Sequence, residues 1–377
     1  MSIGLSYNNK RRNKFTTQLI ETVMISKECF SAEWIEKVSK EFKYNDKNLI
    51  EKVIRALSLL EMLVKAECPL IFKGGTALML ILGKSAHRLS IDIDVICPPG
   101  TNIEDYLKSF MDFGFSNLEL VERKQRGSDI PKSHSKFFYQ IAYRNDSNAQ
   151  SYILLDVLYE NNHYHHTEQI AIDSPFIKLD EQPLMVTVPS AEDILGDKLT
   201  AFAPNTTGIP YYKGDKCCSM EILKQLYDIG RLFDNVSDLE ITTQAFKRIA
   251  EVELSYRSLD NDLKQIYEDI RQTALCIATR GKVGNGNFEL LQDGIIRVKS
   301  FMYKNKYQIE NAIIDGARAA YLATSIEKGN MNIERYSGNV MDIKDMQIQE
   351  SLTNRLNKLK INLPEAFFYW AKTSELL

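Results

Sequence analysis

Two aspartates lie close together in residues 72–96, whose sequence is FKGGTALMLILGKSAHRLSIDIDVI. Side chains alternate across a β-strand, so Ser90, Asp92 and Asp94 are predicted to share one face of a strand. Two carboxylates about 7 Å apart on one face repel each other unless a cation lies between them. Mg²⁺, held by the Asp92 and Asp94 carboxylates and by substrate phosphates, would supply that cation. The alternative is an exposed edge strand with two acids near Arg88.

A glycine pair precedes these aspartates. Lys73, Gly74, Gly75 and Thr76 follow a short apolar strand and open a helical run over residues 77–82. Glycines let the backbone approach a ligand closely, and the amides at a helix N-terminus attract phosphate. These four residues are therefore predicted to bind the phosphates of a nucleotide, although a tight strand-to-helix turn would also account for the glycines.

The order of these motifs resembles a known pattern. A Gly-Gly or Gly-Ser turn, a helix and then D-x-D is the signature of the nucleotidyltransferase fold typified by polymerase beta. The sequences KGGTAL and HRLSIDID resemble the AbiEii/AbiGii toxin family more closely, in which R-x-S-x-D-x-D is typical and is matched by Arg88, Ser90, Asp92 and Asp94. The resemblance covers about residues 65–235 and implies that Arg88 and Ser90 also contribute to nucleotide binding.

A third aspartate, Asp156, lies between Leu154 and Leu158 in a predicted strand over residues 152–159 that is apolar on both faces. An unpaired buried carboxylate costs free energy, so a cation or a strong hydrogen-bond donor is expected beside it. Nucleotidyltransferases often carry a third acid on a neighbouring strand, and the resemblance makes Asp156 the candidate. It would share a metal or accept the proton of the attacking hydroxyl. A structural aspartate bonded to backbone amides is the alternative.

Lys198 is the candidate for contact with a triphosphate. Ser190 and Asp193 predict a capping box at the start of a helix that ends before Pro204. Lys198 falls within the apolar stripe of this helix, where a lysine normally extends its ammonium to solvent. The alternative is a lysine held at a domain cleft and directed at phosphates. The stretch that begins at Asp197, D-K-L-x-A, looks like the third motif of the family, which carries a lysine.

A fourth candidate acid, Asp228, lies on an amphipathic helix predicted over residues 220–233. Lys224, Asp228 and Arg231 share one face of this helix, where a surface ion pair would be worth only about 0.2–0.5 kcal/mol. The stretch KQLYDIGRL is similar to the K-D-x-x-D-L helix of the family, whose aspartate completes the site, and Asp228 is the match. Gln225 stands where the family has an acid directly after the lysine.

The secondary-structure elements that position these residues are predicted to be helices first, then strands, and then helices again. Two helices are predicted over residues 31–67, with Ser31 and Asp46 as N-caps. The predicted strands cover residues 70–72, 89–96, 137–143 and 152–159, and the last two are expected to form a hairpin. From Ser190 onward the pattern is almost entirely helical. The sequence thus predicts an α+β protein with a mixed nucleotidyltransferase sheet and flanking helices in residues 1–190, followed by a helical domain in residues 191–377.

Composition limits the function further. The 377 residues carry a formal charge of −3, so a role with nucleic acid would depend on local basic patches. One such patch is predicted in the residues Arg123, Lys124, Arg126, Lys132 and Lys136, which precede the aromatic strand residues Phe137, Phe138 and Tyr139. A solvated loop beside core aromatic residues is the alternative. No membrane span is expected, and six scattered cysteines indicate reduced thiols in a cytoplasm.

Together these features predict a nucleotidyltransferase with Mg²⁺ on Asp92 and Asp94 and a nucleoside triphosphate between the glycine turn and Lys198. Resemblance implies a toxin of a type IV toxin–antitoxin or abortive-infection phage-defence system, with an RNA acceptor (plausibly tRNA) and a separately encoded antitoxin. Two alternatives stay open: an enzyme of the same fold that modifies a protein hydroxyl or a small molecule, and a catalytically silent binding module.

Overall fold

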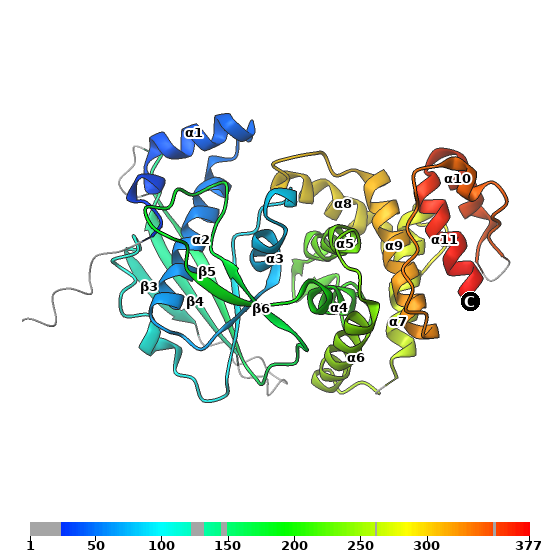
Figure 1. Ribbon diagram of the computed structural model, residues 1–377, viewed down its shortest axis with the longest axis horizontal. Coiled ribbons are helices and arrows are strands. Elements are labelled where there is room, and N and C mark those ends of the chain that lie inside the picture. The colour runs from blue at the N-terminus through cyan, green and yellow to red at the C-terminus, as the bar shows by residue number, and fades with distance from the viewer. Residues whose placement is uncertain (1–23, 122–131, 145–148, 261, 350–351) are drawn as a thin grey trace, which may run out of the picture.

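A five-stranded mixed sheet and an array of helices lie side by side along the longest axis of the molecule (Figure 1). The computed structural model describes residues 24–121, 132–144, 149–260, 262–349 and 352–377. The strand order is β1-β2-β5-β4-β3, in which β2 and β5 run parallel and the other neighbouring pairs run antiparallel. Its strands are β1 (Ile71–Lys73), β2 (Ile93–Cys97), β3 (Asn117–Val121), β4 (Lys132–Gln140) and β5 (Gln150–Tyr159). Two small sheets pair β6 (Thr167–Ala171) with β7 (Met185–Pro189) and β8 (Tyr212–Lys213) with β9 (Lys216–Cys217).

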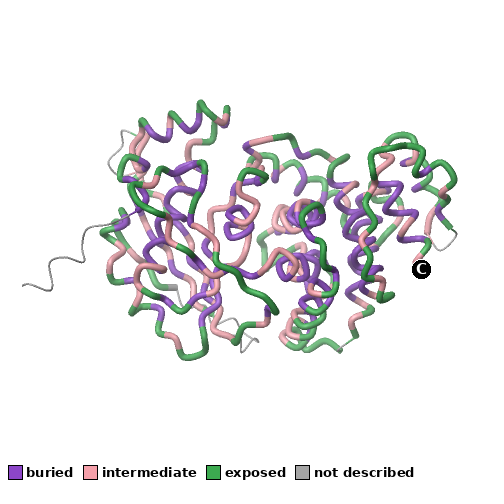
Figure 2. The backbone as a smooth tube through the Cα atoms, viewed as in Figure 1, coloured by how far each residue is buried: buried purple, intermediate pink, exposed green. Residues whose placement is uncertain are grey.

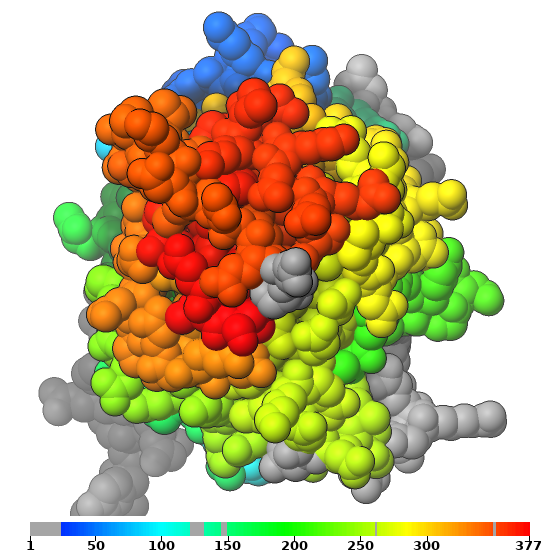
Figure 3. All heavy atoms as spheres, turned by 90° about the vertical axis from the view of Figure 1, so that its right-hand side faces the viewer, coloured from blue at the N-terminus to red at the C-terminus, as the bar shows by residue number. Residues whose placement is uncertain are grey.

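The helices fall into two groups. Three accompany the sheet, namely α1 (Ala32–Phe42), α2 (Lys47–Lys65) and α3 (Gly74–Leu82). The rest form the second half of the molecule: α4 (Ala191–Ala201), α5 (Ser219–Phe233), α6 (Leu239–Tyr256), α7 (Lys264–Ala278), α8 (Phe288–Val298), α9 (Ile309–Lys328), α10 (Leu359–Asn362) and α11 (Pro364–Leu376). The C-terminal residues, orange to red in Figure 3, cover the end of the molecule away from the sheet. The structure therefore confirms the predicted α+β class with a helical C-terminal half.

Two apolar clusters form the interior (Figure 2). One joins the buried face of the sheet to α1, α2 and α3, and the other joins α4 to the helices that follow it. The clusters change over near residue 190, although Leu78 belongs to the helical cluster and Tyr303 to the sheet cluster. The division into residues 1–190 and 191–377 as two domains stays a prediction.

The predicted helix starts are confirmed by side-chain hydrogen bonds. The Ser31 hydroxyl accepts from the backbone N–H of Trp34 at 3.1 Å, and the Asp46 carboxylate accepts from that of Leu49 at 3.0 Å. The Ser190 hydroxyl accepts from the backbone N–H of Asp193 at 3.1 Å. Each bond satisfies one of the amides that a helix N-terminus leaves without an internal partner.

The predicted strand over residues 89–96 is wrong in its first half, because β2 begins only at Ile93. The backbone N–H of Leu89 donates to the carbonyl of Phe301 at 2.8 Å. The Asp92 carbonyl accepts from the Thr76 hydroxyl at 2.7 Å. Residues 89–92 thus form hydrogen bonds with segments outside the sheet instead of inter-strand hydrogen bonds. Ser90 and Asp92 therefore lie in irregular chain before the strand, and Asp94 is the one of the three within it.

Within the described residues, no helix combines the length and the apolar character that crossing a bilayer requires.

Candidate active site

Four polar residues form a row across the sheet. The strand register pairs Lys73 of β1 with Asp94 of β2, Asp94 with Asp156 of β5, and Asp156 with His134 of β4. Side chains at paired positions point to the same face of a sheet, so this row brings together groups from distant parts of the chain. Asp156, the third acid expected on a neighbouring strand, is thus the register partner of Asp94, and its catalytic role stays a prediction.

Burial and the neighbouring carboxylates raise the pKa of Asp94. Desolvation, Asp156 and Asp92 raise the pKa of Asp94 to about 7, against the opposing effect of Lys73 and Lys198. Desolvation also raises the pKa of Asp92, with a further contribution from Asp156. Across the described part of the chain, the Asp92 and Asp94 side chains have neither an ion-pair partner nor a hydrogen-bond partner. A bound cation would relieve this repulsion.

The donor set suits a divalent metal that is shared with substrate. No group of three or more histidine, cysteine, aspartate or glutamate side chains in the described residues is arranged to hold a metal ion. Mg²⁺ often takes only one or two protein carboxylates and completes its shell with phosphate oxygens and water. Asp92 and Asp94 could supply those two carboxylates.

The glycine turn fits closely around the acidic segment. Gly74 has φ = +79°, and a Cβ atom there would lie 2.2 Å from Oδ2 of Asp94. A Cβ atom on Gly75 would lie 2.7 Å from Oγ of Ser90 and 3.0 Å from Nη2 of Arg88. A side chain at Gly74 would therefore have to displace Asp94, and one at Gly75 would have to displace Ser90 and Arg88. The start of α3, where free amides attract phosphate, lies directly beside the Asp94 carboxylate.

Asp156 is not buried, which corrects one sequence expectation. Strand β5 packs Ile153, Leu155 and Val157 into the core, while its other face is partly open, and 36% of the Asp156 side chain is exposed. The strand looked apolar on both faces because leucines alternate with Asp156 on this open side. Nδ1 of His134 makes a short hydrogen bond to Oδ1 of Asp156. The expected strong hydrogen-bond donor beside Asp156 is therefore His134.

His134 is a site residue that the sequence did not reveal. The alternation in the stretch KSHSK indicates a strand, yet only the register of β4 against β5 places His134 opposite Asp156. That register depends on the connection between these strands, whose residues 145–148 lie outside the described part of the chain.

Arg88, Lys198 and Asp228 form a buried charged cluster. Oδ1 of Asp228 accepts from Nη2 and Nε of Arg88 at 2.8 and 3.1 Å, and Oδ2 lies 3.0 Å from Nζ of Lys198. Desolvation would raise the pKa of Asp228, but Arg88 and Lys198 outweigh it and hold the pKa below its usual value. Lys198 also donates to Oε1 of Gln225 at 2.9 Å. Lys198 is thus buried and does not extend to solvent.

The alternative of a surface ion pair among Lys224, Asp228 and Arg231 does not match the structure. Asp228 is only 2% exposed and pairs across the molecule with Arg88. Arg231 pairs instead with Asp315 at 3.3 Å, and Nζ of Lys224 lies 3.9 Å from the centre of the Phe301 ring. Helical spacing shows that Lys224, Asp228 and Arg231 share one face of α5. It does not show their interaction partners, which belong to other elements. The roles of Arg88, Lys198 and Asp228 toward a nucleotide stay predictions.

A cavity of about 620 Å³ opens beside the row. The acidic row residues Asp94 and Asp156 line it together with His134. Basic side chains lie around the same cavity and come from both halves of the chain: Lys73, Lys132, Lys213 and Arg257. Such a cavity can hold an anion next to the carboxylates, as a nucleotide with a bound metal would require.

Part of the predicted basic patch is described. Lys132 lines the cavity, and Nζ of Lys136 lies 3.2 Å from Oε2 of Glu119. Arg123, Lys124 and Arg126 lie outside the described residues.

Comparison with known proteins gives one family. The family described as "Nucleotidyl transferase AbiEii toxin, Type IV TA system" matches residues 57–292. No curated protein matches the chain.

Solved structures show similarity at low sequence identity. JHP933 from Helicobacter pylori is 13% identical, with 81% of this chain and 94% of that chain covered and a TM-score of 0.38. A putative nucleotidyltransferase from H. pylori is also 13% identical, with 83% and 100% covered and a TM-score of 0.37. MenT4, a nucleotidyltransferase toxin from Mycobacterium tuberculosis H37Rv, is 12% identical, with 77% and 89% covered and a TM-score of 0.46.

Proposed function

Because this chain belongs to the AbiEii nucleotidyltransferase toxin family, we propose that it transfers a nucleotide from a nucleoside triphosphate to a hydroxyl of an RNA, plausibly a tRNA. Membership makes it a nucleotidyltransferase and a toxin of the type IV toxin–antitoxin class, and it implies a separate antitoxin. The observation that carries the proposal is the Asp94–Asp156 pair beside the glycine turn, at the wall of a cavity with basic side chains.

Mg²⁺ is the proposed metal, and Asp92 and Asp94 would hold it. When bound, the metal would stabilise charge on the attacking and leaving oxygens of the transfer. Its presence would also oppose the desolvation and the carboxylate repulsion that raise the pKa of Asp94. The identity of the metal is open to a direct test, because a chelator and a set of divalent ions separate the possibilities.

The residues of the chain have separate tasks in the proposed transfer. The amides at the start of α3 and the Lys73 ammonium bind the phosphates of the triphosphate. Asp156 accepts the proton of the acceptor hydroxyl while that oxygen forms a bond to the α-phosphorus and pyrophosphate leaves. His134 holds the Asp156 carboxylate through its Nδ1–H. Asp228 fixes Lys198 and Arg88 behind the glycine turn.

The decisive experiment supplies the protein with possible acceptors and labelled nucleotides in one reaction. Purified protein is incubated with total RNA and each of four labelled triphosphates in Mg²⁺, and the products are treated with RNase or with protease. We expect label on RNA that RNase removes, and no label with Asp94→Asn. Label that only protease removes would replace RNA with a protein acceptor. Absence of any transfer by folded protein would leave a silent binding module and refute the proposal.

A further inference from the structure

A group of lysines lies outside the cavity, on segments that contact residues 84–89, which lead to Asp92. We call this group the basic face and define it as Lys43, Lys84, Lys299, Lys304 and Lys306. The five residues come from three separate segments, namely the turn between α1 and α2, the residues after α3, and the connection between α8 and α9. Residues 83–87 and 299–308 contain no aspartate or glutamate. The face is thus positive within a chain whose net charge is −3.

Contacts between the three segments make the face continuous. Nζ of Lys304 donates to the Lys84 carbonyl at 3.4 Å and lies 5.9 Å from the centre of the Phe42 ring. The Tyr44 hydroxyl donates to the Ser300 carbonyl. In Figure 1 these segments meet above α3, between α1 and α8.

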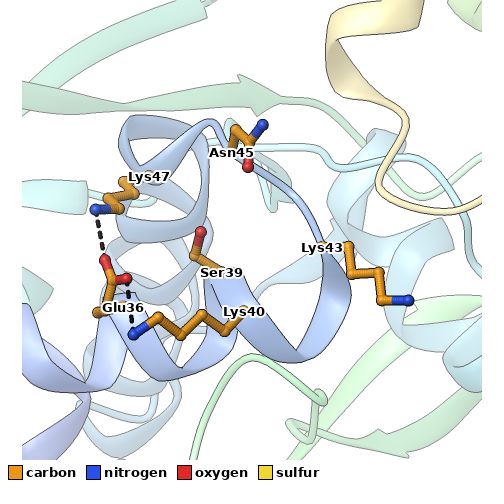
Figure 4. Close-up of a pocket in the computed structure, with 6 residues that line it drawn as sticks. All are labelled: Glu36, Ser39, Lys40, Lys43, Asn45 and Lys47. Atoms are coloured by element: carbon orange, nitrogen blue, oxygen red, sulfur yellow. Dashed lines mark ion pairs between the residues drawn. The ribbon is translucent and has the colours of Figure 1, made fainter.

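In Figure 4, Lys43 is the lysine that no ion pair joins to Glu36. The hollow between α1 and α2 also contains Lys40 and Lys47, but both are ion-paired with Glu36, at 3.2 and 2.5 Å. Lys43 points away from that carboxylate. None of the five lysines of the face has an ion-pair partner among the described residues. Gathering unpaired like charges costs free energy, which a bound polyanion would return.

The face leads directly to the acidic segment of the candidate active site. The connection between α8 and α9 bonds to residues 87–89, through Met302 opposite Arg88 and the Phe301 carbonyl on the Leu89 amide. Nζ of Lys224 lies over the Phe301 ring of the same connection. Lys84 of the basic face and Asp92 thus belong to one segment, which the connection between α8 and α9 contacts at residues 87–89.

We propose that the basic face binds the phosphodiester backbone of the RNA acceptor and directs its hydroxyl toward the carboxylates. This inference rests on the proposed RNA acceptor. A triphosphate already has the glycine turn and the cavity, whereas exposed lysines on three segments suit a ligand with a repeating negative charge. The C-terminal half of the chain would then contribute to acceptor binding through Lys299, Lys304 and Lys306.

The test compares two triple charge reversals. K84E/K299E/K306E changes three exposed lysines of the face, and K247E/K282E/K328E changes three exposed lysines of α6, α9 and the residues after α7. Binding of labelled tRNA is measured by fluorescence anisotropy over a range of NaCl concentrations. Loss of three phosphate contacts should reduce the slope of log K against log salt by about 2. The matched control should keep the wild-type slope, and both variants should keep the wild-type KM for the triphosphate.

Three results would overturn the inference: an unchanged salt slope in the face variant, an equal change in the control, or a face variant that labels RNA as wild type does. The neutral variant K84Q/K299Q/K306Q removes the objection of misfolding, because it should also flatten the slope. Different results would refute the proposed RNA acceptor and the proposed role of the basic face. Wild-type protein that labels no RNA refutes the acceptor, whereas labelled RNA with an unaffected face variant refutes only the basic face.

Discussion

The Asp94 carboxylate shows how one residue links stability to function. Its pKa in the folded protein is about 7, whereas its ordinary value is 3.8. Between these values the unfolded chain releases its proton and the folded chain retains it, so rising pH lowers the stability of the fold. The cost is complete above pH 7 and absent below about pH 4. A shift of this size corresponds to about 4 kcal/mol, and partial solvent access reduces it to about 2 kcal/mol.

Asp94→Asn should therefore stabilise the metal-free protein by about 2 kcal/mol at pH 8 and by nothing near pH 4. Urea denaturation with a chelator at both pH values measures this difference. Adding Mg²⁺ should stabilise the wild-type protein but not the variant, so the difference in their free energies of unfolding should become smaller. Equal stability of the two proteins at pH 8 would mean that the Asp94 carboxylate is well solvated or already paired.

His134 and Asp156 lead to a second prediction at this scale. His134→Ala removes the donor to Asp156 and should lower kcat about 100-fold, since the orientation of a proton acceptor controls its efficiency. His134→Asn keeps an N–H near the position of Nδ1 and should retain most of the activity. The KM for the triphosphate should stay near wild type in both. Identical losses in the two variants would show that His134 acts through more than its bond to Asp156.

At the scale of elements, the backbone strain at Gly74 can be tested separately from its close contact with Asp94. Gly74 and Gly83 both have positive φ, at +79° and +48°, but a Cβ atom on Gly83 would meet nothing within 4 Å. Alanine at either position should destabilise the fold by about 1–3 kcal/mol. Only Gly74→Ala should displace Asp94 and abolish both nucleotide transfer and the stabilisation by Mg²⁺. If Gly74→Ala and Gly83→Ala reduce nucleotide transfer equally, the contact between Gly74 and Asp94 is not what the site requires.

Local elements were predictable where a short stretch determines them. The caps at Ser31, Asp46 and Ser190 and the helical second half follow from side chains within a few residues of each helix start. The extent of β2 did not follow, because the bonds of Leu89 come from a segment over 200 residues later in the chain. Likewise, the motifs identified Asp92 and Asp94, while His134 depended on the register of two strands.

At the scale of the whole molecule, one buried cluster ties the sheet side to the helical side. Arg88 precedes the acidic segment, Lys198 lies on α4 and Asp228 on α5, and all three are at most 7% exposed. One carboxylate here pairs with two cations. Removing its charge leaves both cations buried without the carboxylate that pairs with them, which typically costs about 3–5 kcal/mol.

Asp228→Asn should therefore lower the stability by about 3–5 kcal/mol and reduce transfer, because Arg88 and Lys198 lose their fixed positions behind the glycine turn. Thermal denaturation and the transfer assay test this on the same protein sample. The control is Asp105→Asn, which breaks the exposed pair with Lys108 and should change stability by less than about 1 kcal/mol. A second variant, R88M/K198M/D228M, replaces the whole cluster with apolar side chains and should recover much of the stability without recovering transfer. If Asp228→Asn instead keeps the wild-type Tm while transfer is lost, the Asp228 carboxylate acts on the substrate directly rather than by positioning its neighbours.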